Sequence, residues 1–178
     1  MSRLEELLNF SDVQLQQACE LLIESFNIGR DSNVVAVYVP GRVEFLGKHT
    51  DYAGGRSLLM TVQKGFRMVA HPRRDDILRI ATGRKGQPEV QQFVYGQIPP
   101  HQPGHWVNYT ATLARRLLAN FGTCPELTHA GKPSLLGADI AFVSDLPIAA
   151  GMSSSSALVV AMFLCISQIN HLDHTEAY

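Results

Sequence analysis

The amino-acid sequence predicts an α+β protein in which helices pack on one mixed β-sheet. A helical pattern at residues 11–26 comes first, several strand patterns follow from the apolar β-branched run at 34–39 onward, and a helix, a strand and a final helix complete the chain. Elements in this order favour a single sheet with helices packed on it. A chain of 178 residues is long enough to form one such domain with a sizeable core.

The first two elements are predicted from capping and apolar spacing. The helix at 11–26 has Ser11 or Asp12 as its N-cap, and its apolar face ends at Phe26. The run at 34–39, VVAVYV, is apolar throughout, which is typical of a strand covered on both faces.

The middle of the chain predicts more strands. Residues 57–72 indicate either a strand pair or one strand bent near Gly65. Two further strands are expected at 76–82 and 89–95, because the turn sequence GRKGQP separates them.

The last third of the chain predicts helix, strand and helix. A helix is expected at 105–121, with Trp106, Tyr109, Leu113 and Leu117 on one face and Gly122 as its C-terminal stop. A strand follows at 138–147, and a glycine-serine turn then opens a strongly apolar helix.

Composition and charge restrict the class of protein. Hydrophobic residues make up 46% and charged residues 17% of the chain, as in a folded globular protein, and the formal net charge of −1 does not suggest nucleic-acid or membrane binding. The three cysteines are widely spaced, which predicts reduced, structural thiols. The acidic N-terminal residues do not resemble a secretory signal, and the longest apolar run, 157–166, is shorter than the roughly 20 residues that span a bilayer. We therefore expect a cytoplasmic protein.

Residues 40–55, PGRVEFLGKHTDYAGG, form an unusually polar segment after a buried strand, and we interpret it as a turn. Asp51 can accept hydrogen bonds from vicinal hydroxyls, His49 can donate or accept, and Arg42 can stabilise a phosphoryl group in transfer. The pattern predicts a small polyol bound beside a phosphate. Two alternatives are a solvated surface pair of Arg42 and Lys48, and a metal site at His49 and Asp51, for which two ligands rarely suffice.

The segment 146–158, LPIAAGMSSSSAL, places a glycine and four serines at the start of a helix. The backbone N–H groups of a helix N-terminus bind phosphate readily, and serine hydroxyls can donate to phosphate oxygens or reach Mg²⁺. The alternative is an ordinary helix cap made by Ser153 or Ser154, with nothing bound.

In this order and spacing, the segments 40–55, 105–113 and 146–158 resemble the first two-fifths of a galactokinase, within the GHMP small-molecule kinases. The likeness extends from about Ala18 to Asn170. It implies that residues 1–178 are the family's N-terminal lobe, which binds ATP, Mg²⁺ and a sugar at a cleft with a second lobe. It also implies ATP-dependent phosphorylation of galactose at the anomeric hydroxyl, giving galactose 1-phosphate.

The resemblance assigns roles by position. Arg42 is similar to the family's arginine that stabilises the transition state. The sugar-binding residues that it implies are Arg42, Lys48, His49, Asp51 and Tyr52. The nucleotide-binding residues that it implies are Trp106, Tyr109, Ala149, Gly151, Met152, Ser153, Ser154 and Ser155, with Ser155 near the Mg²⁺ ion. For Trp106 and Tyr109, a role in the core is the alternative.

The sequence departs from the family at three places. Lys48 stands where the family has Glu or Asp, Glu44 stands where it has Asn, and Ala149-Ala150 replaces a glycine pair. A cation held against a sugar needs a partner, and Glu44 is a candidate. The sugar therefore stays open, and a non-catalytic sugar- or nucleotide-sensing protein and a kinase for another sugar are the alternatives.

The family's catalytic aspartate lies in a later segment that no residue of this chain matches, and Asp145 is interpreted as a loop or capping residue. We therefore expect an N-terminal fragment that has no useful turnover alone. A structural lobe that binds neither ligand well is a further alternative. The surface that would meet a second lobe is expected to favour self-association.

Overall fold

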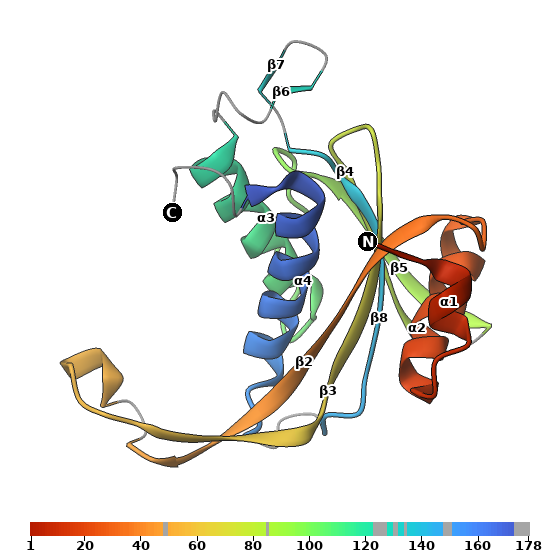
Figure 1. The fold of residues 1–178 in the computed structure, drawn as a ribbon. Helices are drawn as coiled ribbons and strands as arrows, with labels where there is room; N and C mark the ends of the chain where they lie inside the picture. The colour runs from red at the N-terminus through yellow and green to blue at the C-terminus, as the bar shows by residue number, and fades with distance from the viewer. Residues whose placement is uncertain are drawn as a thin grey trace.

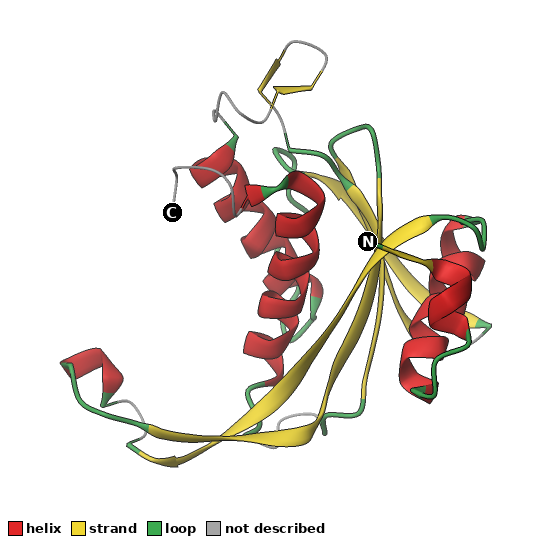
Figure 2. Ribbon diagram, in the orientation of Figure 1, coloured by secondary structure: helices red, strands yellow, loops and turns green. Residues whose placement is uncertain are grey.

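The computed structural model shows one twisted sheet with helices on both faces (Figures 1 and 2). It describes residues 1–47, 50–84, 86–122, 128–129, 132–133, 135–147 and 151–172, with only the backbone at 51, 84, 128–129 and 132–133. Within these ranges the main sheet has six strands in the order β1-β2-β3-β8-β4-β5. The β4–β8 pair is parallel and the other pairs are antiparallel, so the predicted mixed α+β sheet is confirmed.

The elements have the following bounds. The strands of the main sheet are β1 (Ser2–Arg3), β2 (Asn33–Leu46), β3 (Leu58–Pro72), β4 (Ile77–Arg84), β5 (Gln87–Val94) and β8 (Ala138–Ser144). A separate pair is formed by β6 (Thr128–His129) and β7 (Lys132–Pro133). The helices are α1 (Leu4–Leu8), α2 (Val13–Phe26), α3 (Val107–Phe121) and α4 (Ser154–Asn170), with a short 3-10 helix η1 at Asp51–Ala53.

The sheet separates two apolar layers. Helices α1 and α2 cover one face, and α3 and α4 cover the other, as Figure 1 shows. Because successive strand residues point to opposite faces, Val34 packs in the α2 layer and Val35 in the α4 layer. The prediction that this strand is covered on both sides holds at Val34 and Val35, but further along the α2 side Ala36 and Tyr38 are exposed. None of the helices in the described ranges combines the length and apolar character that crossing a membrane requires.

The polar segment after residue 40 is a strand at its beginning, and our interpretation of it as a turn was wrong there. Strand β2 pairs with β3 from Val35 to Leu46, with irregularities in register between Pro40 and Arg42 and again before Leu46. Polar side chains are tolerated because the ladder satisfies the backbone groups while this end of the strand stays largely exposed.

The predicted strand region 57–72 forms one long strand, β3 (Leu58–Pro72), rather than a strand pair. Gly65 lies within this strand. A glycine is needed at this position because the backbone of β2 passes very close, and a Cβ would lie 2.3 Å from the carbonyl oxygen of Val39. Glycine therefore marks a close approach between β2 and β3.

Helix α3 begins two residues after the predicted start, and its buried face matches the predicted one except at Tyr109. Tyr109 is 46% exposed, whereas Ala111 and Ala114 are buried. Leu117 is buried as predicted, Trp106 and Leu113 pack partly buried against the same core, and the two alanines lie in the layer that α3 shares with α4.

Candidate functional site

The structure brings the polar segment and the serine-rich segment together at Arg42. The backbone N–H of Arg42 donates to the carbonyl oxygen of Met152 at 3.2 Å. Its side-chain Nε donates to the hydroxyl oxygen of Ser153 at 3.3 Å. Two motifs far apart in the sequence therefore meet where β2 passes the start of α4.

Close packing beside Arg42 holds this contact in place. A Cβ on Gly41 would lie 2.5 Å from Leu146 Cδ2 and 3.1 Å from the oxygen of Met152, so a larger residue there would force Leu146 and Met152 to move. Helix α4 packs against β2 and β3, and Ala157 and Leu158 in its first turns are buried. Helix α4, which begins in the serine-rich segment, therefore packs directly on β2, the strand that carries Arg42.

The start of α4 is not an ordinary serine cap. Ser153 occupies the N-cap position with φ 52° and ψ 40°, in the left-handed region, and its side chain caps no helix N–H group. Its hydroxyl instead accepts the hydrogen bond from Arg42. A left-handed non-glycine residue costs about 1–2 kcal/mol, and such strain concentrates at functional sites.

The first turn of α4 suits an anion. The opening N–H groups of any helix lack an intrahelical acceptor and carry a partial positive charge. The first helical bond here runs from Ala157 N to Ser153 O at 3.0 Å, so the groups that precede Ala157 are available. Arg42 is exposed next to them, and it adds a full positive charge.

The remaining residues of the predicted phosphate loop are only partly placed. Met152, Ser154 and Ser155 are half-buried at the start of α4, and Gly151 has φ 70°, which favours glycine. Ala149 lies outside the described residues. The described ranges hold no cluster of three or more His, Cys, Asp or Glu side chains fit to bind a metal, and the role of Ser155 near Mg²⁺ stays a prediction.

Two of the predicted sugar-binding residues, Asp51 and Tyr52, lie at the end of the β2–β3 hairpin, which projects beyond the helices in Figure 1. Asp51 begins η1, where only its backbone is described, and Tyr52 follows with 83% of its side chain exposed. Lys48 and His49 lie outside the described residues, so the proposed pairing of Glu44 with Lys48 stays a prediction.

The connection at the end of this hairpin is held by its own hydrogen bonds. The hydroxyl of Thr50 donates to the carbonyl oxygen of Gly47 at 2.7 Å and is 3.1 Å from that of Arg56. The hydroxyl of Ser57 donates to the same Gly47 oxygen at 3.1 Å. Gly47 has φ 86°, and a Cβ there would meet the Arg56 oxygen at 2.4 Å, so this turn requires glycine.

Of the two aromatic residues predicted near the nucleotide, Trp106 is packed and Tyr109 is exposed. The Trp106 ring meets Phe142 edge-on, with centroids 5.4 Å apart, and its Nε1–H donates to Glu89 Oε1 at 2.8 Å. The Phe142 ring in turn lies 5.7 Å from that of Phe66 on β3. These contacts support the core alternative for Trp106, and a contact with a nucleotide stays a prediction for both residues.

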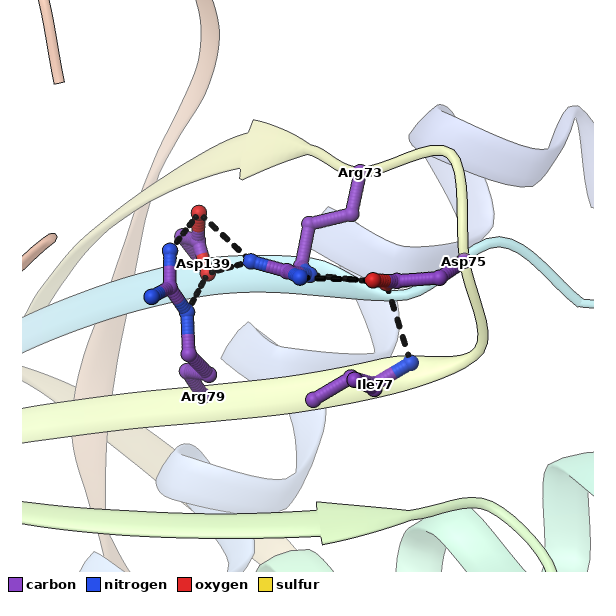
Figure 3. A network of polar contacts seen from close by, with 5 residues as sticks. All are labelled: Arg73, Asp75, Ile77, Arg79 and Asp139. Atoms are coloured by element: carbon purple, nitrogen blue, oxygen red, sulfur yellow. Dashed lines mark hydrogen bonds and ion pairs between the residues drawn. The ribbon is translucent and has the colours of Figure 1, made fainter.

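The sequence reading missed a buried polar network on the α2 side of the sheet (Figure 3). Asp139 on β8 is 2% exposed and accepts hydrogen bonds from Arg73 and Arg79, the latter at 2.5 and 2.7 Å. Arg73 also pairs with Asp75, and that bond holds the pKa of the Asp75 carboxyl below its ordinary value. The available signal was a single aspartate inside the apolar strand ADIAFV.

Comparison with known proteins agrees with this arrangement. The galactokinase galactose-binding signature matches residues 24–72, and the N-terminal domain of the GHMP kinases matches residues 108–178. The galactokinase of Chloroflexus aurantiacus is 34% identical over 134 residues, covering 75% of this chain and 31% of that relative. The human galactokinase is 30% identical over 163 residues, covering 86% of this chain and 38% of that relative. The chain thus spans about a third of the length of these two relatives.

Solved structures show the same fold. Lactococcus lactis galactokinase complexed with galactose matches with a TM-score of 0.65 at 23% identity, over 86% of this chain and 37% of that one. A mevalonate kinase matches with a TM-score of 0.53 at 15% identity, over 80% and 41%. The fold and its matched segments are those of a GHMP kinase N-terminal domain. Within that class the chain is galactokinase-like, and it matches the N-terminal part of its relatives.

Proposed function

We propose that this chain provides the sugar-binding and phosphate-binding part of a galactokinase-like sugar kinase. Such an enzyme transfers the γ-phosphoryl group of MgATP to the anomeric hydroxyl of a hexose, with galactose as the first candidate. The observation that carries the proposal is the Arg42–Ser153 contact, because it joins the segment that matches a galactose-binding signature to the segment that matches a GHMP kinase domain. In this proposal residues 1–178 act as one lobe.

Charge stabilisation is the chemistry that this site offers. The phosphoryl group in transfer carries its charge on its outer oxygens, and enzymes stabilise it by positioning and by positive charge. Here the Arg42 guanidinium and the opening N–H groups of α4 would act together on those oxygens. The hydroxyl of Ser153 orients Arg42, while those of Ser154 and Ser155 would face MgATP.

The hairpin end would bind the sugar. Asp51 offers a carboxylate that can accept hydrogen bonds from two neighbouring hydroxyl groups, and His49 and Tyr52 add further polar groups beside it. Lys48 would then decide which sugar is preferred, because a lysine donates where a carboxylate accepts. The catalytic base would come from the part of the relatives that this chain does not span, so the 178-residue polypeptide alone is expected to show no useful turnover.

The test is ADP release by the longest natural form of the protein, measured with MgATP and a panel of hexoses. Galactose-dependent release would support a galactokinase, and release with another sugar would make Lys48 a specificity determinant. Binding of a sugar without ADP release would overturn the kinase proposal and favour a sensor.

The role of Arg42 is tested by Arg42→Ala in the same protein. We expect kcat to fall on the order of 10²-fold while KM changes little, since the lost interaction acts mainly in the transition state. Arg116→Ala is the matched control, because Arg116 is exposed on α3 and lies outside the proposed site. An unchanged kcat in Arg42→Ala would refute this role.

Self-association belongs to the same proposal. Large apolar side chains on the projecting hairpin are 44–62% exposed: Phe45, Leu46, Leu58, Leu59 and Met60. An exposed apolar surface of this kind drives association. Sedimentation velocity of the 178-residue polypeptide over a concentration series would reveal oligomers, and a monomer at all concentrations would refute it.

A further inference from the structure

A second charged cluster lies on the α2 side of the sheet, centred on Arg67 of β3. The Arg67 side chain is only 15% exposed. Its Nε donates to Asp12 Oδ2 at 3.0 Å, and its Nη1 lies 3.6 Å from Asp145 Oδ1. The guanidinium also lies over the ring of Tyr38, 4.4 Å from the ring centroid. One arginine thus contacts helix α2, strand β2 and the segment that follows β8.

Asp12 holds the guanidinium from the α2 side. Its Oδ1 caps α2 by accepting from the backbone N–H groups of Gln14 and Leu15, at 2.9 and 3.1 Å. Burial opposes ionisation of this carboxyl, but the hydrogen bonds from Leu15, Arg67 and Gln14 outweigh it and lower the pKa of Asp12. The carboxylate is therefore charged at neutral pH, and it fixes Arg67 where its Nη1 faces Asp145.

Asp145 is the residue through which this cluster reaches the candidate site. Its Oδ1 accepts a hydrogen bond from the backbone N–H of Gly65 at 2.7 Å, which ties the end of β8 to β3. Gly65 is the register partner of Pro40, two positions before Arg42. The next residue, Leu146, is the one whose side chain stands against Gly41.

Asp145 on one side and Met152 and Ser153 on the other, which flank residues 148–150 outside the described ranges, are thus held on one short stretch of the β2–β3 ladder. Asp145 binds Gly65 at the first end. Met152 and Ser153 bind Arg42 at the last end. Because Gly65 pairs with Pro40, two positions from Arg42, we expect a shift at the first anchor to displace the N–H groups at the start of α4 as well.

We propose that Asp145 and Arg67 are positioning residues for the phosphate-binding start of α4. They fix the first end of the serine-rich segment, as Arg42 fixes the last. Neither residue touches phosphate or sugar. Because they act only on the position of the start of α4, their loss weakens nucleotide binding, while sugar binding at the hairpin end stays the same. This inference rests on the proposed function, since it takes the start of α4 as the nucleotide site.

The experiment measures dissociation constants of MgADP and of galactose separately, by calorimetry, on the longest natural form of the protein. Asp145→Ala removes both the Gly65 hydrogen bond and the charge facing Arg67, and we expect roughly tenfold weaker MgADP binding. Asp145→Asn keeps an acceptor for Gly65, and we expect about threefold, as for a partly exposed ion pair. Arg67→Met, which removes the same charge from the other side, should resemble Asp145→Asn.

Asp75→Ala is the matched control. Asp75 also pairs with an arginine and also accepts from a backbone N–H group, that of Ile77 at 3.3 Å. It lies beyond the opposite end of β3 from the serine-rich segment. We expect Asp75→Ala to lower thermal stability and to leave both dissociation constants unchanged.

The outcomes separate this inference from the proposed function. Weaker MgADP binding in the order Asp145→Ala, then Asp145→Asn, with constant galactose binding, supports it. An equal loss for both ligands, or unchanged MgADP binding with a lower melting temperature, reduces the cluster to a structural role and overturns the inference. If Asp145→Ala does not fold, Asp145→Asn and Arg67→Met decide by the same criteria. A wild-type protein that binds no MgADP refutes the proposed function itself, whatever the variants do.

Discussion

The buried carboxylate of Asp139 provides the sharpest test of how the sheet is stabilised, through the substitution Asp139→Asn. The two Asp139 oxygens face Arg73 Nη1 at 3.0 and 3.3 Å and Arg79 at 2.5 and 2.7 Å (Figure 3). An asparagine keeps the shape but removes the charge and turns an NH₂ group toward one of the guanidinium groups. Both the charge balance and part of the hydrogen bonding are then lost.

The magnitude follows from burial. Removing one partner of a fully buried ion pair costs about 3–5 kcal/mol. The Asp139 side chain is 3% exposed, but those of Arg73 and Arg79 are 20% and 28% exposed and can regain some hydration. We therefore expect a loss of about 2–3 kcal/mol in the free energy of unfolding, or roughly 4–12 °C in Tm for a domain of this size.

Urea unfolding followed by circular dichroism measures this loss, and the slope with urea should stay unchanged. Asp76→Asn is the control, because Asp76 is an exposed aspartate in the loop between β3 and β4 that carries Arg73 and Asp75. A loss for Asp139→Asn below about 1 kcal/mol, the range of surface pairs, would refute the argument that burial makes this network strong.

Two further predictions concern the sheet and its close contacts. Gly41→Ala should weaken nucleotide binding by the full protein, because the added Cβ meets Leu146 Cδ2 at 2.5 Å and, at 3.1 Å, the Met152 oxygen that accepts from Arg42; unaltered nucleotide affinity would contradict this. Burial lowers the pKa of His71 from its ordinary 6.5, outweighing the opposing charge of Asp139, so the unfolded chain binds more protons below that pH. Stability should therefore fall as the pH drops from about 7 to 5. His71→Leu should reduce that fall in urea titrations, and an identical pH profile would contradict the assignment.

Local patterns predicted the elements whose determinants are close in sequence. Asp12 caps α2 as an aspartate before an apolar periodic run should, and the GRKGQP turn joins β4 and β5. The same local patterns did not predict structure that depends on pairing with residues far away in the sequence. The long extension of β2 to Leu46 exists because β3 pairs with it, and nothing near residue 40 reports that pairing.

The candidate site shows the same division. The serine-rich segment and Arg42 were both singled out from residue type, and the structure brings them into contact. The Arg67 and Asp139 clusters were missed, because Arg67 meets Asp12 and Asp145, and Asp139 meets Arg73 and Arg79, across long distances in the sequence. A lone aspartate on an apolar strand indicates that a buried partner exists, but it does not identify the partner.

Ser153 is the residue where local and distant effects compete. A serine at the N-cap would ordinarily bind its own helix, a bond worth about 1 kcal/mol. Here Ser153 adopts the left-handed conformation, which costs about 1–2 kcal/mol, and its hydroxyl accepts a hydrogen bond from Arg42 instead. A hydrogen bond to the exposed Arg42 side chain contributes little to stability. We therefore interpret this arrangement as one that positions Arg42.

Two substitutions at this position separate strain from function. Ser153→Gly adopts a left-handed conformation without strain and should be as stable as the wild type or slightly more so, whereas Ser153→Ala keeps the strain and should not gain. Both lose the Arg42 contact, so both should slow phosphoryl transfer in the full protein. A glycine variant that is clearly less stable than the alanine variant in urea unfolding would show that Ser153 is not strained. A glycine variant with wild-type kcat would show that the hydroxyl does not position Arg42.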